Sequence, residues 1–66
     1  METQVLLTRR QNDVLQLLKL GMTDLEIAWK LNISPRTVQD HIEAMGEKFG
    51  VRGRGRIVSY AYEHGL

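Results

Sequence analysis

The sequence has 66 residues, of which 42% are hydrophobic and 26% charged, with no cysteine and a formal net charge of +1. This composition excludes disulfides and thiolate metal sites, and it is that of an ordinary soluble chain rather than a disordered one. No run approaches the roughly 18 apolar residues of a membrane span and the N-terminus lacks a secretory signal, so a cytoplasmic location without membrane contact is expected.

The length allows one domain, over residues 1–66, whose core is small enough that dimerisation is a common route to stability. His41 and His64 lie far apart in the sequence without other metal-ligating residues around them, so no metal is expected. Nothing in the chain predicts a cofactor or a small-molecule ligand. No nucleophile–base set or phosphate-binding loop appears either, which argues against an enzyme.

The first predicted helix begins at a capping box. Thr8 has a hydroxyl that can accept the backbone N–H three residues later, and Gln11 stands where its amide can accept the N–H of Thr8. Apolar residues then recur at helical spacing until Gly21 interrupts them. The pattern predicts a helix over residues 9–20.

The second predicted helix also begins at a capping box. Thr23 and Glu26 form the stronger version of the capping box and predict a helix over residues 24–31. Ala28 has a small side chain that allows a following helix to cross closely, and Asn32 enters the left-handed region more readily than other non-glycine residues. This joint placement predicts that the second and third helices form a helix-turn-helix.

Two further helices complete the chain. Ser34 is a favourable N-cap and Pro35 suits the first helical position, so a third helix is predicted over residues 35–49. Apolar residues that follow the arginine-rich stretch RGRGR predict a fourth helix over residues 54–64, ended by Gly65. No segment alternates with period two, so the fold class is all-α, a four-helix domain.

With these residues placed, the chain resembles the DNA-binding domain of the LuxR-type transcription regulators. The match extends from residue 7 to residue 66, and the residues that carry it are Leu7, Thr8, Glu26, Ile27, Ala28, Ser34, Thr37, Val38, His41, Gly50, Val51 and Arg54. The resemblance implies a helix-turn-helix domain that binds double-stranded DNA, with the third helix in the major groove and the fourth helix pairing two protomers. A sequence-specific transcription regulator, or the output domain of one, is the expected function.

The chain departs from the usual pattern of this family mainly in its third helix. Gly46 stands where a large apolar residue is usual, and glycine is a poorer helix former than alanine by roughly 1 kcal/mol. Gln39 replaces a common lysine, and Glu43 occupies a position that is often basic. Smaller departures are Arg9 for proline and Gln11 for glutamate. The third helix is therefore less cationic than the resemblance implies.

The third helix is predicted to have an apolar buried side and a polar outer side. The buried side consists of Val38, Ile42, Met45 and Phe49, and the outer side of Arg36, Gln39, Asp40, Glu43 and Glu47. Glutamine pairs with adenine in the major groove and a carboxylate accepts from cytosine, so Gln39, Asp40 and Glu43 are expected to face base edges. Polar and basic residues are expected to hold the DNA backbone, namely Ser34, Arg36, Thr37, Lys48, Arg52 and Arg54. An ordinary solvated acidic face is the alternative for the carboxylates.

Two ring-bearing residues invite other interpretations. His41 adjoins the buried side of the third helix and is interpreted as a packed, hydrogen-bonded structural residue rather than a ligand. Trp29 is predicted to point away from the third helix, and packing at an edge of the fold is favoured over a docking site for another molecule. Neither residue is therefore expected to take part in catalysis or metal binding.

The fourth helix is predicted to pair two protomers. Its core side has Ile57, Val58 and Ala61, and the opposite side consists of Gly55, Ser59, Tyr62 and Glu63. Small residues four apart allow two helices to approach closely, and a tyrosine beside them adds apolar area with a polar tip. A homodimer through this side is therefore expected, with a solvated helix surface as the alternative.

A protein-interaction module is the rival function. In this interpretation the acidic third helix and Trp29 bind another protein, for example to inhibit a related regulator. The near-neutral net charge favours this rival, whereas the arginine clusters at residues 9–10 and 52–56 favour DNA. DNA binding remains the leading prediction.

Overall fold

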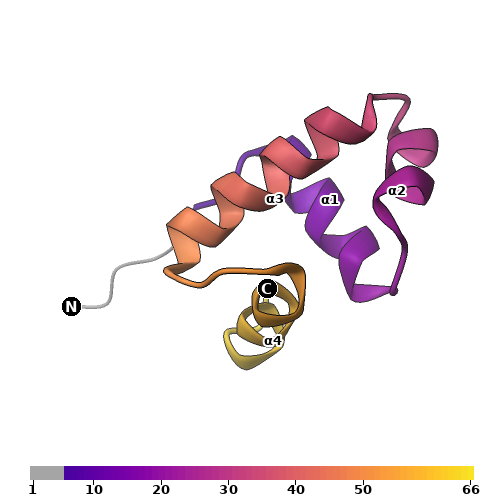
Figure 1. Cartoon of the computed structure of the whole chain (residues 1–66). Coiled ribbons are helices and arrows are strands. Elements are labelled where there is room, and N and C mark those ends of the chain that lie inside the picture. The colour runs from indigo at the N-terminus through magenta and orange to yellow at the C-terminus, as the bar shows by residue number, and fades with distance from the viewer. Residues whose placement is uncertain (1–5) are drawn as a thin grey trace.

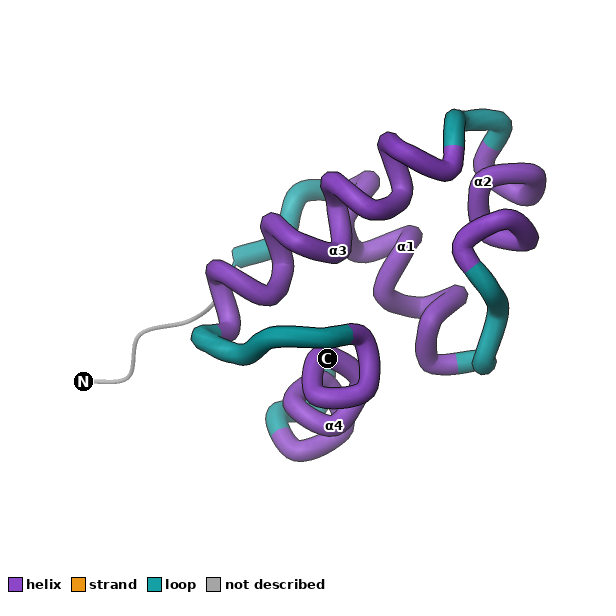
Figure 2. Tube along the Cα trace, viewed as in Figure 1, coloured by secondary structure: helices purple, strands orange, loops and turns teal. Residues whose placement is uncertain are grey.

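The computed structural model describes residues 6–66, which form four α-helices: α1 (Arg9–Lys19), α2 (Asp24–Leu31), α3 (Pro35–Phe49) and α4 (Arg54–Glu63) (Figures 1 and 2). Between the helices, this part of the chain has only turns and loops, so the all-α prediction is confirmed. α1 and α4 each end one residue earlier than predicted, because Leu20 and His64 take the C-cap positions. None of the helices within residues 6–66 is long and apolar enough to span a membrane.

Both predicted capping boxes are present. The Thr8 hydroxyl accepts the Gln11 N–H at 3.1 Å, and Gln11 Oε1 accepts the Thr8 N–H at 3.0 Å. Thr23 and Glu26 make the same reciprocal pair at 3.2 and 2.9 Å. The Thr23 N–H donated to the Glu26 carboxylate lowers the pKa of Glu26 below its usual 4.5, so the stability this cap contributes is present above that pH and lost as the pH falls. Each box determines where its helix begins.

The turn between α2 and α3 has the predicted helix-turn-helix geometry. Asn32 has φ 57° and ψ 46°, and among residues 6–66 it is the only non-glycine residue with positive φ. The Ile33 N–H donates to the Ala28 carbonyl at 3.0 Å, and the Ala28 side chain is buried. Ser34 then caps α3, because its hydroxyl accepts the Thr37 N–H at 3.0 Å.

α3 is the centre of the fold and packs against each of the other helices. α2 lies near one end of α3, α4 lies below the other end, and α1 lies behind (Figure 1). The core between them consists of Val14, Leu15, Leu18, Ile27, Ala28, Val38, Ile42, Met45, Phe49, Ile57 and Ala61. The predicted buried side of α3 is therefore confirmed, and its burial directs the opposite side of the helix to solvent.

Gly46 is the point at which the chain after α3 crosses back over this helix. α3 ends at Gly50 in the left-handed conformation, with φ 73°, and the N–H groups of Gly50 and Val51 both point to the Gly46 carbonyl. The Val51 carbonyl oxygen then lies 2.8 Å from the position that a Cβ on Gly46 would occupy. The missing side chain of Gly46 permits this close crossing, a role that its low helix propensity does not indicate.

Candidate nucleic-acid interface

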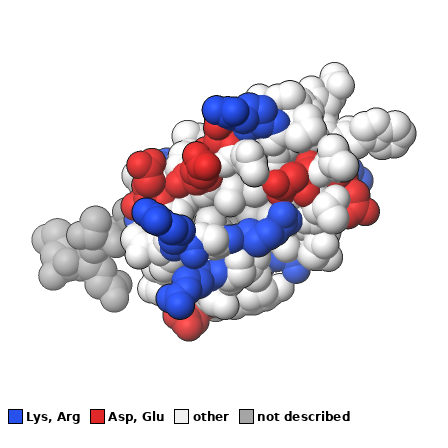
Figure 3. Space-filling view, in the orientation of Figure 1, with Lys and Arg blue, Asp and Glu red and all other residues white. Residues whose placement is uncertain are grey.

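The outer side of α3 is exposed along its length. Arg36, Gln39, Asp40, Glu43 and Glu47 are all exposed, as predicted. In the space-filling view, acidic side chains lie over α3 with basic side chains beside and below them (Figure 3). The candidate interface is therefore a stripe of negative charge bordered by positive charge, and not a uniformly basic face.

The first turn of α3 is held by its own side chains. The Ser34 hydroxyl both accepts the Thr37 N–H at 3.0 Å and lies 2.9 Å from the Thr37 hydroxyl. Arg36 Nε lies 3.3 Å from Asp40 Oδ1, and these side chains are 83% and 62% exposed. An ion pair so exposed contributes little to stability. A phosphate can therefore replace Asp40 as the partner of Arg36 at small cost.

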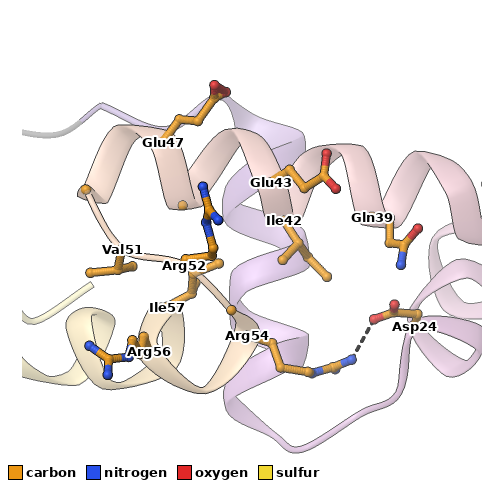
Figure 4. Close-up of a pocket in the computed structure, with 13 residues that line it drawn as sticks. Asp24, Gln39, Ile42, Glu43, Glu47, Val51, Arg52, Arg54, Arg56 and Ile57 are labelled. Atoms are coloured by element: carbon orange, nitrogen blue, oxygen red, sulfur yellow. Dashed lines mark hydrogen bonds and ion pairs between the residues drawn. The ribbon is translucent and has the colours of Figure 1, made fainter.

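A hollow of about 950 Å³ lies between α3 and the segment that leads into α4 (Figure 4). Its residues are Asp24, Gln39, Ile42, Glu43, Gly46, Glu47, Gly50, Val51, Arg52, Gly53, Arg54, Arg56 and Ile57. In Figure 4 the Arg52 side chain extends towards α3 between Glu47 and Glu43. The close crossing at Gly46 thus places Arg52 opposite the carboxylates of α3.

Arg54, which the sequence predicts as a DNA contact, is engaged within the fold. Its Nη1 donates to Asp24 Oδ1 at 2.7 Å, and its Nη2 donates to the Met22 carbonyl at 2.6 Å (Figure 4). Arg54 therefore braces the start of α4 against the start of α2. Asp24 was not singled out from the sequence, where its only signal is its place in the first turn of the second helix.

Lys48, another predicted DNA contact, is also engaged within the fold. Its Nζ donates to Gln11 Oε1 at 2.7 Å and to the Leu6 carbonyl at 2.9 Å. Gln11 is buried, so the ammonium group satisfies an acceptor that already belongs to the capping box of α1. Lys48 therefore ties the end of α3 to the beginning of α1.

The remaining basic side chains divide into paired and available groups. Arg10 lies 3.6 Å from Asp13, and Lys19 donates to the Leu66 carbonyl. Within residues 6–66, the basic side chains that make no ion pair or hydrogen bond are Arg9, Lys30, Arg52 and Arg56. Arg52 and Arg56 border the hollow beside α3, so they are the cations best placed to meet a ligand there.

The predicted dimer residues lie together on the free side of α4. Gly55, Ser59, Tyr62 and Glu63 are all exposed. Tyr62 is partly anchored to α1, because its hydroxyl donates to the Lys19 carbonyl at 3.4 Å and Lys19 Nζ lies 4.9 Å from its ring centroid. This contact gives the tyrosine a defined position at the surface.

Trp29 and His41 differ from what the sequence predicted. The Trp29 side chain is 92% exposed, so the expectation of edge packing is wrong. His41 is half-buried, but its ring makes no hydrogen bond to any residue from 6 to 66, which corrects the expectation of a hydrogen-bonded histidine. Within the same range, no group of three or more His, Cys, Asp or Glu is arranged to hold a metal ion.

Comparison with known sequences gives a family and several relatives. Residues 5–61 match the family described as bacterial regulatory proteins, luxR family. The spore germination protein GerE of Bacillus subtilis is 42% identical over 57 residues, which are 86% of this chain and 77% of that protein. The CsgBAC operon transcriptional regulatory protein of Escherichia coli is 37% identical over 59 residues, 89% of this chain but 27% of that protein. The second similarity is therefore confined to about a quarter of the relative.

Solved structures share the fold. The transcription factor GerE matches with a TM-score of 0.83 and 32% identity, covering 96% of this chain and 92% of that one. The Vibrio cholera VqmA–ligand–DNA complex matches with a TM-score of 0.91 and 31% identity, covering 97% of this chain and 28% of that one. The similarity thus spans nearly all of a short relative and one part of a much longer one.

Proposed function

This chain belongs to the luxR family of bacterial regulatory proteins, a family of DNA-binding transcription regulators, and we propose that it recognises a specific duplex sequence by placing α3 in the major groove. The observation that carries the proposal is the exposed outer side of α3, with arginines of the following segment beside it. The major groove accommodates an α-helix, and the similarity to a chain solved with DNA supports this use of the fold. A regulator of genomic DNA acts in the cytoplasm.

The side chains of α3 divide into base-reading and backbone-holding groups in this proposal. Gln39 offers an amide that matches the major-groove edge of adenine, and the carboxylates of Asp40 and Glu43 accept from the amino group of cytosine. Arg36 and Arg52 have exposed guanidinium groups on either side of these residues and bind phosphates. In this arrangement the carboxylates face the DNA bases, while the guanidinium groups face the phosphates of the two DNA strands.

The start of α3 offers neutral phosphate contacts. Ser34 and Thr37 are occupied in capping the helix, and they hold its first turn so that the backbone N–H of Arg36 can bind a phosphate, since Pro35 has no N–H and the N–H of Thr37 is donated to Ser34. Lys48 and Arg54 contribute indirectly, because Lys48 braces α3 against α1 and Arg54 braces α4 against α2. Neutral contacts and bracing explain how a domain of net charge +1 can hold a polyanion.

Selection from a random duplex pool at several salt concentrations tests this function. We expect enrichment of a defined sequence, with an affinity that falls as salt rises. Three cations placed at the interface, Arg36, Arg52 and Arg56, predict a slope of log K against log salt of about −3 per protomer. Retention of no duplex at low salt contradicts the proposal, as does binding of all sequences with equal affinity.

A homodimer through α4 completes the proposal. The exposed side of this helix has Gly55 and Ser59, whose small side chains permit close approach, and the anchored ring of Tyr62 beside them. Two protomers related by a two-fold axis then present two copies of α3 to a pseudo-palindromic site. Sedimentation is expected to show a dimer on DNA, which Ser59→Arg disrupts. A monomer at high micromolar concentration, with and without DNA, contradicts this part.

A second candidate function follows from the unpaired carboxylates of α3. Within residues 6–66, Glu43 and Glu47 make no ion pair, so they are available to a basic surface of a heterologous regulator. Such an interaction inhibits that regulator by forming a mixed complex. The duplex selection separates the two functions, because an interaction module retains no DNA at low salt.

A further inference from the structure

Three outer side chains of α3 form a row that faces the hollow beside this helix. Gln39, Glu43 and Glu47 are spaced four residues apart, so they lie one above the other on the helix surface. All three are exposed and line the hollow between α3 and the segment that leads into α4 (Figure 4). Within residues 6–66, none of their side chains makes a hydrogen bond or an ion pair. This hollow-facing row therefore meets a ligand with its polar atoms available.

Asp40 lies outside the hollow-facing row. It does not line the hollow, and its Oδ1 lies 3.3 Å from Arg36 Nε. Because the guanidinium of Arg36 is proposed to bind a phosphate, the carboxylate next to it lies on the side of α3 that faces a DNA strand. The hollow-facing row is therefore better placed than Asp40 to read a base.

The position of each member along α3 separates Glu47 from the other two. Glu47 belongs to the last turn of the helix, which ends at Phe49. The residues of a recognition helix that contact base edges lie towards its N-terminal end. Gln39 and Glu43 come earlier in α3, so they are the two members of the row that are placed to meet bases.

The side chains of Gln39 and Glu43 differ in the base that they select. The amide of Gln39 has both a donor and an acceptor, which match the N7 atom and the N6 amino group of adenine. The carboxylate of Glu43 only accepts, so it needs a base that offers a donor in the major groove. Cytosine offers its N4 amino group, whereas guanine and thymine present acceptors and adenine adds the acceptor N7 beside its amino group. Gln39 therefore selects adenine, and Glu43 selects cytosine.

The spacing of Gln39 and Glu43 along α3 determines the spacing of the two bases. Four residues correspond to a rise of about 6 Å along an α-helix. In zinc fingers, helix side chains about one turn apart contact successive bases, principally on one strand. The same separation on α3 places the bases contacted by Gln39 and Glu43 next to each other.

We propose that the target duplex of this domain has an adenine and a cytosine at adjacent positions of one strand, contacted by Gln39 and Glu43 respectively. The inference rests on the proposed function, because it requires α3 to lie in the major groove. It adds the sequence that the duplex must contain, which is 5′-AC or 5′-CA, according to the direction in which α3 runs along the strand. A pseudo-palindromic site contains this pair of bases twice, once for each protomer.

Selection from a random duplex pool, with the original chain and with two exchange variants, tests the inference. The original chain is expected to select adjacent adenine and cytosine. Glu43→Gln is expected to select adenine in place of the cytosine, and Gln39→Glu cytosine in place of the adenine, each without a change at the other base. In polarisation with the selected duplex, replacing the C·G pair by T·A is expected to weaken binding to the original chain roughly 5- to 150-fold.

Glu47→Gln is the matched control, because it makes the same change as Glu43→Gln within the same row. It is expected to select the sequence of the original chain. Since all three positions are exposed, circular dichroism is expected to show unchanged helix content in every variant. A selected sequence without adjacent adenine and cytosine overturns the inference but leaves the proposed function standing, and so does a Glu43→Gln variant that still selects the cytosine. Retention of no duplex, or of all sequences equally, overturns both.

Discussion

Gly46→Ala is expected to lower the free energy of unfolding by about 1–3 kcal/mol, the usual cost of forcing extra volume into a packed site. Helix propensity alone predicts a gain of roughly 1 kcal/mol. The steric cost wins because the new Cβ would lie 2.8 Å from the Val51 carbonyl oxygen, which belongs to the backbone. The Val51 N–H donates to the Gly46 carbonyl at 3.0 Å. The backbone of Val51 can therefore make room for the new Cβ only by moving away from α3.

Urea unfolding followed by circular dichroism measures this effect, and each 1 kcal/mol also corresponds to roughly 4–8 °C in Tm for a domain of this size. Gly55→Ala is the matched control, because Gly55 is also helical but a Cβ there meets nothing within 4 Å. The control is expected to gain up to roughly 1 kcal/mol. Dilute protein is used, since Gly55 lies on the proposed dimer side. Equal gains in both variants would show that the crossing is not tight.

Opening the crossing also has a functional consequence. The segment that passes over Gly46 carries Arg52 to the side of α3, where it stands opposite Glu43 and Glu47. A variant that folds but displaces this segment is expected to lose duplex affinity as well as stability. Substitution of Gly46 is therefore expected to lower both the stability of the fold and the affinity of its proposed interface for DNA.

Glu43→Lys is expected to remove much of the preference for one duplex sequence while raising affinity for duplexes of other sequence. The carboxylate is exposed near the middle of α3, where it can accept from a cytosine, and such a contact is worth about 1–3 kcal/mol of discrimination. A lysine there loses that acceptor and gains attraction to phosphates. Competition between the selected duplex and a scrambled duplex, at two salt concentrations, measures both changes.

Glu47→Lys is the matched control for this experiment. It makes the same change of charge one helical turn further along the same exposed side of α3, beside the same hollow. We expect it to raise affinity uniformly and to leave the preference for the selected duplex intact. If both variants behave in this way, the carboxylates of α3 form a solvated face that merely repels DNA, and the assignment of base reading to Glu43 is wrong.

Local hydrogen bonding explains why the helices could be predicted from the sequence. The capping boxes at Thr8 and Thr23 join residues three apart, so each can be predicted from residues that are close in the sequence. Asn32 satisfies a backbone requirement of a single residue in the turn. The exposed side of α3 followed from the helical spacing of its apolar residues, which needs no knowledge of the partner helices.

Tertiary structure decided where the long side chains of the candidate site go. Arg54 reaches an acceptor 30 residues away in the chain and Lys48 one 37 residues away, so their bracing roles depend on how the helices pack. The need for Gly46 likewise arises from a backbone carbonyl of the next segment. The sequence by itself determined the four helices, the turn and the exposed stripe, because each depends on interactions within a few residues. Only the fold determined which basic side chains make no ion pair or hydrogen bond within residues 6–66, and that the Trp29 side chain is exposed to solvent. Both depend on distances between residues that are remote in the chain.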